Sequence, residues 1–262
     1  PGTPWRHSGD EPLLLARLHP GARVVVDPKR LRSGPVGMEL YRPDLVVLDD
    51  GCQHLAVDRD LDLILLRPDD LGCGWNRVFP AGRWREGKTA LGRADAFLVK
   101  VPPEGPDETL CQSAKGRLKG FGKPVFPFSL RATGLIRADG KGESRDLAGR
   151  PYLLATAVAE PAQVAATAED LLGYPPAGRL DFSDHHGFTA ADVRCIRERA
   201  EAAGASQVVA TSKDAAKLEA AGAGAVWSLN LDVLFHEPIL GREAFREWWE
   251  ARWAELNDKA AR

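Results

Sequence analysis

Two adjacent acids, Asp49 and Asp50, follow a run of apolar residues in the segment LVVLDDGCQH (45–54). A carboxylate at the carboxyl end of a buried strand can hold Mg²⁺ beside nucleotide phosphates, directly or through water. Successive strand side chains point opposite ways, so we expect only one of the two acids to face the phosphates, unless the strand has already ended. Asp-Asp-Gly is also a common turn, so a metal site and a plain turn both remain open.

The stretch GRWREGKT (82–89) matches the phosphate-loop pattern G-x-x-x-x-G-K-[ST]. That pattern binds phosphate only where a buried strand runs into the first glycine and a helix begins at the lysine. The preceding residues, GCGWNRVFPA, are poor strand formers, and only TALGRAD separates Lys88 from the next apolar run, too few residues for a crossover helix. We therefore predict that the match is accidental. The charged side chains of the stretch either line a ligand site at the end of a strand or form a solvated surface loop: Arg83, Arg85, Glu86 and Lys88.

Two further segments place polar side chains directly after a predicted strand. DFSDHHGFT (181–189) puts Asp184, His185 and His186 between a predicted strand and a predicted helix. A lone His is more often structural, but two beside an Asp favour a functional role. TSKDAAKL (211–218) also follows a predicted strand, with Thr211, Lys213 and Asp214 at its end, and is equally typical of a helix cap.

SGDEP (8–12), which contains Asp10, is typical of a helix start, with Ser or Asp as the cap and Pro early.

The elements that position these residues alternate between strands and helices. Runs at 22–27, 44–50, 61–68 and 95–102 are continuously apolar, which predicts parallel strands buried on both faces. Pro, Gly and polar alternation over 124–151 favour a hairpin or linker rather than another parallel strand.

Beyond residue 151 the strands YLLATAVA, GRLDFS and QVVAT alternate with the helices EPAQVAATAEDLLGY and TAADVRCIRERAEAAG. We expect an N-terminal α/β domain over 1–123, a linker over 124–151 and a smaller α/β domain over 152–262.

A helix near 241–258 is expected to end the chain and to pack back on the first domain. Its large apolar side chains recur at spacings of three, four and seven: Phe245, Trp248, Trp249, Trp253 and Leu256. Such a stripe favours core packing over a membrane-interface role, because interfacial helices are usually more basic than this one.

Composition excludes several classes of protein. A net charge of −2 over 262 residues gives no long-range attraction to nucleic acid. The four cysteines are far apart, with neither a C-x-x-C pair nor a His at zinc spacing, so we expect reduced cytosolic thiols. No apolar run approaches the roughly 20 residues that span a bilayer.

Taken together, these segments resemble the tetraacyldisaccharide 4'-kinase family, which phosphorylates the 4'-hydroxyl of a lipid disaccharide with ATP in lipid A biosynthesis. The DDG-x-QH and PAG-x-x-RE blocks are the most specific. The blocks that carry the resemblance run nearly end to end: GDEPLLLA (9–16), DDGCQHLAVDRDLDLILL (49–66), NRVFPAGRWRE (76–86), RADAFLVK (93–100), DFSDHHGFT (181–189) and TSKDAAKL (211–218). The resemblance implies a P-loop-NTPase-like parallel sheet domain and a smaller second α/β domain joined by a β-hairpin linker.

The chain departs from the family pattern in places. Cys52 stands where a large apolar residue is usual, Arg83 where Pro is usual and Ser212 where Glu is usual. The family's phosphate loop and its membrane-associating segment lie upstream of the GDEP block, and the sequence contains neither. The resemblance therefore implies a kinase truncated at its start, and it leaves open whether the chain is active without that segment.

The resemblance also implies roles for individual residues. Asp10 would be the general base that accepts the proton of the sugar hydroxyl, and His185 would orient or tune its carboxylate. Asp49 and Asp50 would lie near Mg²⁺. The side chains expected to line the ATP site are Asp49, Asp50, Gln53, His54, Arg85 and Glu86. The expected partner is a lipid A disaccharide precursor. The chain is expected to bind it as a monomer, at the cytoplasmic face of the bacterial inner membrane.

Two other functions remain open. A DHH-type phosphoesterase also carries an Asp-His-His run but needs a second cluster of metal ligands. No such cluster is evident around the six histidines His7, His19, His54, His185, His186 and His236. The other alternative is a non-catalytic remnant that binds lipid or a partner through the Trp-rich helix.

Overall fold

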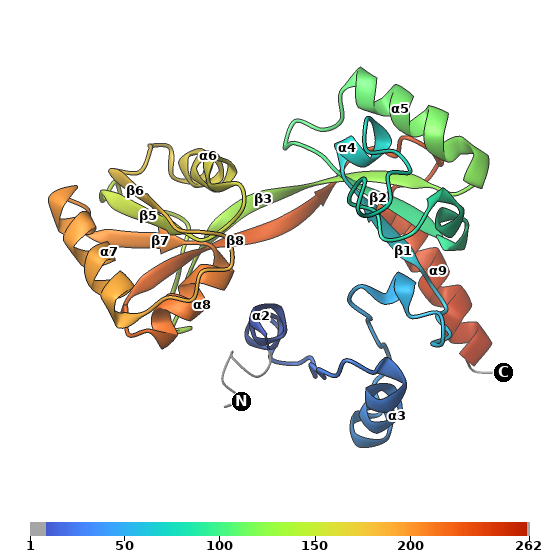
Figure 1. The fold of residues 1–262 in the computed structure, drawn as a ribbon, viewed down its shortest axis with the longest axis horizontal. Coiled ribbons are helices and arrows are strands. Elements are labelled where there is room, and N and C mark those ends of the chain that lie inside the picture. Colours follow the sequence, from blue (N-terminus) through green and yellow to red (C-terminus); the bar gives the residue numbers. More distant parts are fainter. Residues whose placement is uncertain (1–8, 261–262) are drawn as a thin grey trace. The chain divides into compact units, whose positions relative to one another are not determined.

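The computed structural model describes residues 9–260, apart from the side chains of Asp10, Arg17 and Ala260. Its sheet is mostly parallel, with strand order β1-β2-β3-β8-β7-β5-β6 and β4 paired to β3 (Figure 1). The predicted α/β class is confirmed. The chain divides into unit 1 (residues 1–28 and 131–232) and unit 2 (residues 29–130 and 233–262).

Two long strands belong to both units. β3 (Val125–Arg137) runs from unit 2 into unit 1, and β8 (Val226–Phe235) returns from unit 1 to unit 2. β3 begins as a parallel strand beside β2 (Ala96–Lys100), with Phe97 opposite Val125, because Val125–Ser129 are as buried as β2 itself. Only its second half forms the expected hairpin, with β4 (Glu143–Ser144). The interpretation of 124–151 as lacking a parallel strand is therefore wrong for its first residues.

In unit 2, β1 (Leu63–Leu66) pairs in parallel with β2. The predicted strands at 61–68 and 95–102 are thus confirmed. The helical segments of this unit are α3 (Arg30–Tyr41), η1 (Gly51–Gln53), α4 (Pro68–Leu71), η2 (Lys88–Arg93), α5 (Glu108–Leu118), η3 (Lys119–Phe121) and α9 (Phe245–Ala260).

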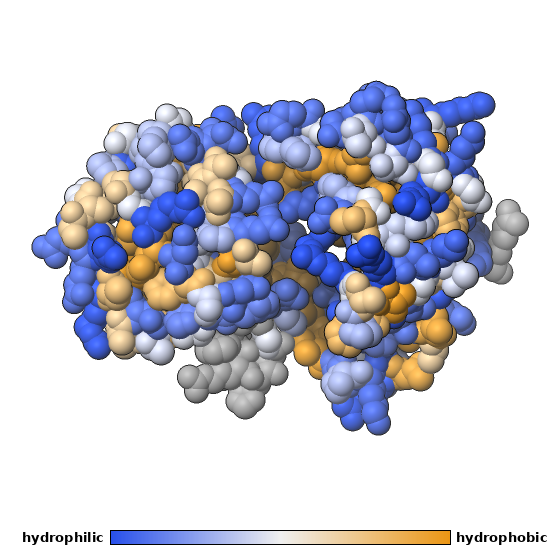
Figure 2. Space-filling model, turned by 45° about the horizontal axis from the view of Figure 1, so that its top comes forward, coloured by the Kyte–Doolittle hydropathy of each residue, from blue (hydrophilic) through white to orange (hydrophobic). Residues whose placement is uncertain are grey.

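The predicted strands at 22–27 and 44–50 are wrong. Neither run is a strand, and Val47 is 81% exposed. A strand needs its backbone N–H and C=O groups paired, and residues 9–260 offer no neighbouring strand to either run. Most of their apolar side chains remain exposed. The surface of the molecule shows hydrophobic patches among the hydrophilic residues (Figure 2).

Helices cover both faces of the sheet in unit 2. Phe97 and Val99 point to one face and pack with α5, whereas Leu98 and Phe126 point to the other and pack with Trp248 of α9. Phe245 of α9 stacks on Phe235 with ring centroids 3.8 Å apart. The predicted core role of the aromatic stripe is confirmed for this part of the helix.

Unit 1 repeats this layering. β5 (Tyr152–Thr156) lies between β6 (Gly178–Asp181) and β7 (Gln207–Ala210), and all three are parallel to the adjoining part of β8. Alternate residues of β5 face α6 (Pro161–Leu172) on one side, and α7 (Ala190–Ala202) with α8 (Ser212–Ala220) on the other. The strands and helices predicted after residue 151 are confirmed. Helix α2 (Asp10–Leu18) packs against α8 (Figure 1).

Candidate functional site

The carboxyl ends of the parallel strands in unit 1 carry the predicted polar loops. β5 ends at Thr156, β6 at Asp181 and β7 at Ala210, so the Asp-His-His loop and the start of α8 lie at one edge. Ligand sites of open α/β sheets lie at this edge. The Nζ atom of Lys213 is 3.0 Å from Nδ1 of His185 there.

The two adjacent histidines have different surroundings. His186 stacks on Phe182 with ring centroids 4.9 Å apart, and its Nε2 lies 3.2 Å from Oδ2 of Asp192. His185 has a φ of 60°, a left-handed conformation that is uncommon for residues other than glycine, and it is exposed. His186 therefore holds the loop, and His185 is the more exposed of the two histidines.

Asp192 fastens this loop to α7. Its Oδ2 accepts hydrogen bonds from the hydroxyl of Thr189 at 2.7 Å and from the Thr189 backbone N–H at 2.8 Å. These bonds, and the contact with His186, hold the pKa of Asp192 below its usual value. The carboxylate is consequently ionised at neutral pH, and the capping box at the start of α7 stays closed.

The TSKD segment forms the helix cap that its sequence predicts. The hydroxyl of Thr211 accepts a hydrogen bond from the backbone N–H of Asp214 at 3.2 Å. Asp214 is fully buried, and its Oδ2 accepts from Thr211 Oγ1 at 2.8 Å and from the Ala157 backbone N–H at 3.0 Å. The cap thereby ties α8 to the end of β5.

Asp10 is the first residue of α2, directly after Gly9, which has a φ of 83°. Its side chain lies outside the described residues. Its backbone belongs to unit 1, as does His185, and α2 packs against α8, the helix whose Lys213 contacts that histidine.

The second group of predicted residues lies in unit 2. Nη1 of Arg85 is 3.3 Å from Oδ2 of Asp50 and 3.1 Å from Oε1 of Gln53. Asp50 itself has a φ of 53°, and it occupies the N-cap position of the short helix η1 without a side-chain cap hydrogen bond. Because Arg85 and Asp50 are both exposed, this ion pair contributes little to stability and opens at small cost.

Arg93 also links the loop that contains Asp50 and Gln53 to the loop that contains Arg85 and Glu86. Its Nη2 lies 2.8 and 3.0 Å from the carboxylate oxygens of Glu86, and it donates to the backbone carbonyl of Cys52 at 3.2 Å. Sequence reasoning missed Arg93, although the family block RADAFLVK contains it. It is the last residue of η2, three residues before β2 begins at Ala96.

The structure thus brings together Asp50, Gln53, Arg85 and Glu86. His54 shares the loop, where its backbone carbonyl accepts from Arg59 at 2.9 Å. Within residues 9–260 the carboxylate of Asp49 makes neither a hydrogen bond nor an ion pair. No group of three or more His, Cys, Asp or Glu residues that could hold a metal ion occurs in this part of the chain.

The phosphate-loop match lacks the structure that such a loop requires. No strand runs into Gly82; instead, Val78 forms a single bridge with Trp84, whose indole N–H donates to Asp70 at 2.8 Å. Lys88 begins the short 3₁₀ segment η2, and its backbone N–H donates to the side chain of Asn76 at 2.7 Å. The backbone donor needed for a phosphate is already used.

We therefore expect Lys88→Ala to leave the affinity for ATP unchanged, because the backbone N–H bond to Asn76 does not depend on the lysine side chain. Isothermal titration calorimetry with Mg²⁺·ATP measures this affinity. Arg85→Ala is the matched comparison from the same loop and should weaken binding. A collapse of binding in Lys88→Ala would instead restore the phosphate-loop interpretation.

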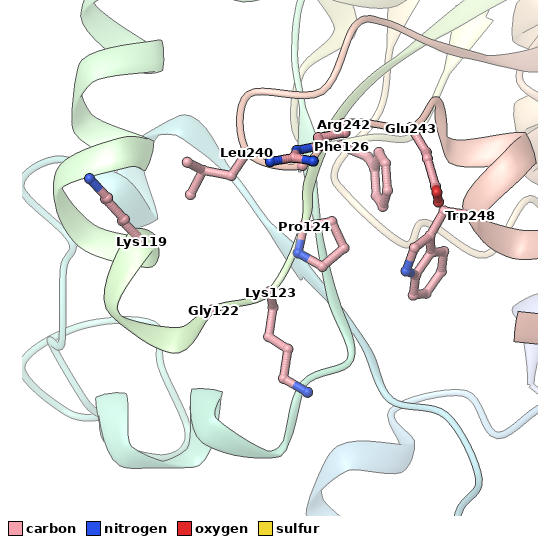
Figure 3. Close-up of a pocket in the computed structure, with 10 residues that line it drawn as sticks. Lys119, Gly122, Lys123, Pro124, Phe126, Leu240, Arg242, Glu243 and Trp248 are labelled. Carbon is pink, nitrogen blue, oxygen red and sulfur yellow. The ribbon is translucent and has the colours of Figure 1, made fainter.

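Unit 2 also contains a cavity of about 380 Å³. It lies where β3 begins, at the opposite strand end from a ligand site of a parallel sheet, and Phe126, Leu240 and Trp248 line it. The side chains of Lys119 and Lys123 point away from each other rather than into a common space (Figure 3). We therefore do not assign the nucleotide to this cavity.

Comparison with known proteins places these features in a family. The family model described as tetraacyldisaccharide-1-P 4'-kinase matches residues 1–248. The tetraacyldisaccharide 4'-kinase of Oleidesulfovibrio alaskensis is 46% identical, over 98% of this chain and 75% of that protein. The enzyme of the same name from Nitratidesulfovibrio vulgaris is 45% identical, over 95% of this chain and 69% of that protein.

A solved structure of a protein from this family has a similar fold. The crystal structure of the "apo" form of LpxK from Aquifex aeolicus in complex with ATP matches with a TM-score of 0.67 and 28% identity, over 90% of this chain and 67% of that one. This chain belongs to the tetraacyldisaccharide 4'-kinase family.

Proposed function

We propose that unit 1 of this kinase serves the acceptor sugar and unit 2 serves the nucleotide. The chain is a lipid-sugar kinase that phosphorylates the 4'-hydroxyl of a tetraacyldisaccharide 1-phosphate with ATP in lipid A biosynthesis. The observation that carries this function is the family match across residues 1–248. The assignment of roles to side chains rests on the geometry of each unit.

In unit 1 we assign the general base to Asp10 and its orientation to His185. Phosphoryl transfer asks a protein mainly for positioning, for charge stabilisation and for one base aimed at the nucleophile. The packing of α2 on α8 supports the pairing, because α8 also holds the contact between Lys213 and His185. A positioned base contributes on the order of a hundredfold or more to turnover.

In unit 2 we assign the phosphates of ATP to two loops, the one that contains Asp50 and the one that contains Arg85. Arg85 supplies positive charge, and Arg93 fixes Glu86 and the loop of Asp50 against each other. The residues assigned to ATP are Asp49, Asp50, Gln53, His54, Arg85 and Glu86. The exposed carboxylates of Asp49 and Asp50 suit Mg²⁺, which binds one or two carboxylates together with substrate phosphates and water. When bound, the ion would offset phosphate charge.

We also propose that the chain works as a monomer. Because its acceptor is a lipid, we propose that it acts at the cytoplasmic face of the inner membrane. Among residues 9–260, no helix combines the length and the apolar character needed to cross a bilayer. Helix α3 supports peripheral association. It buries none of its residues, and it exposes Leu31, Val36, Met38 and Leu40.

The function is tested by transfer of labelled phosphate. With γ-labelled ATP and tetraacyldisaccharide 1-phosphate in detergent micelles, we expect label in the lipid, at the 4' position of the sugar. Thin-layer chromatography and mass spectrometry of the product measure this transfer, and the same lipid already phosphorylated at its 4'-hydroxyl is the control acceptor. Metal-dependent release of phosphate from that control lipid, without label transfer from ATP, would contradict the kinase and favour a phosphoesterase.

A further inference from the structure

The contact between Lys213 and His185 has a definite chemical direction. The two nitrogens, Nζ and Nδ1, are 3.0 Å apart, within hydrogen-bond distance. A lysine ammonium has three N–H donors and no acceptor. Nδ1 must therefore accept the bond with its lone pair, which leaves the ring proton of the neutral imidazole on Nε2.

We propose that Lys213 is a positioning residue that holds His185 as the neutral Nε2–H tautomer. The proposal rests on the proposed role of His185 beside Asp10. An imidazole whose Nδ1 accepts from Lys213 can only donate through Nε2. It therefore acts as a hydrogen-bond donor to the carboxylate of the base, and it does not take the proton of the sugar hydroxyl itself.

One backbone position fixes both partners of this contact. The N–H of Ala157, just beyond β5, donates to the buried carboxylate of Asp214 at 3.0 Å, and its carbonyl accepts from the N–H of His185 at 3.3 Å. Asp214 follows Lys213 in the first turn of α8. The strand end therefore sets the position of the lysine and of the histidine together.

The location of Lys213 is unfavourable for the helix that carries it. A cation in the first turn of a helix opposes the positive end of the helix dipole. The stability of α8 alone therefore does not explain a lysine at this position. A second lysine of the helix, Lys217, donates to the backbone carbonyl of His186 at 3.2 Å. Helix α8 therefore contacts the Asp-His-His loop through two lysines.

Nitrogen NMR of the protein labelled with ¹⁵N-histidine tests the tautomer without any need for activity. Long-range ¹H–¹⁵N correlation distinguishes a protonated ring nitrogen from one with a free lone pair, and His185→Gln assigns the signal. At neutral pH we expect His185 to show a protonated Nε2 and an unprotonated Nδ1. A protonated Nδ1, alone or as the imidazolium, would overturn the proposal.

Substitution of Lys213 tests the consequence for catalysis. A wrong imidazole tautomer costs a serine protease about 10⁴-fold in turnover, and for a histidine that only positions the base we expect Lys213→Met to cost at least ~10-fold in kcat. KM for ATP should not change. Lys213→Arg keeps a cationic donor and should recover most of kcat together with the Nε2–H signal. Lys141→Met, an exposed lysine of unit 1, is the matched control and should behave as wild type.

The outcomes separate this proposal from the proposed function. Wild-type kcat in Lys213→Met, alongside a large loss in His185→Gln, would reject the positioning role and keep the role of His185. Wild-type kcat in both variants would reject the assignment of His185. The NMR spectrum of the unmodified protein decides the tautomer in either case.

Discussion

Replacing Asp10 by Asn should lower kinase turnover by at least about a hundredfold, the contribution that a positioned general base makes. The amide has nearly the same size as the carboxylate, but it cannot accept the proton of the sugar hydroxyl. ATP binding should persist, because the residues assigned to the nucleotide belong to unit 2 and Asp10 belongs to unit 1. Initial rates at saturating ATP and lipid measure the loss, and calorimetry with Mg²⁺·ATP measures binding.

Asp170→Asn is the matched control for this change. Asp170 lies on α6 of the same unit, is exposed, and makes no hydrogen bond or ion pair within residues 9–260. The control should retain wild-type turnover. If Asp10→Asn also retained it, the assignment of the base would be wrong, and another group would have to accept the proton.

Sequence patterns predicted the second half of the chain well, because local and tertiary signals agree there. The strand YLLATAVA became β5, whose alternate side chains meet α6 on one face and α7 with α8 on the other. The helices also carry their own signals, such as Thr189 and Thr211 at the N-caps of α7 and α8. Each element could therefore be recognised before its neighbours were known.

The same reasoning failed for 22–27 and 44–50, where apolar composition alone predicted strands. Composition favours a strand but cannot supply the adjacent strand with which its backbone must pair. The C-terminal stripe shows the converse case. Its spacing and low basic character favoured core packing, and the contact of Trp248 with Phe126 supplies the neighbour that this pattern requires.

The candidate sites were predicted as residue types, but not as contacts. Motif order indicated Asp50, Arg85 and Glu86, and the structure brings them together. Neither the clamp formed by Arg93 nor the bond from Lys213 to His185 could be predicted, since each joins loops that are distant in sequence. Such contacts depend on which strand ends become neighbours in the sheet, and local sequence patterns do not predict the order of the strands.

The two adjacent acids should differ in their importance for Mg²⁺·ATP. Oδ2 of Asp50 is engaged by Arg85, whereas within residues 9–260 the carboxylate of Asp49 has no hydrogen-bond or ion-pair partner and so is available to a cation. We expect Asp49→Asn to lower turnover by on the order of a hundredfold, as expected for loss of charge stabilisation at the phosphates. Asp50→Asn should cost less, because it removes a partner of Arg85 and leaves Gln53 to hold the guanidinium.

Titration with Mg²⁺ separates these two roles. If Asp49 meets the metal, Asp49→Asn should raise the Mg²⁺ concentration needed for half-maximal rate, and Asp50→Asn should leave it almost unchanged. The reverse order would mean that the exposed pair between Asp50 and Arg85 opens when the nucleotide binds, so that Asp50 turns to the metal and Arg85 to a phosphate. Because an exposed ion pair costs little to break, the structure permits that exchange, and only the relative Mg²⁺ requirement of the two variants can reject the assignment of Asp49.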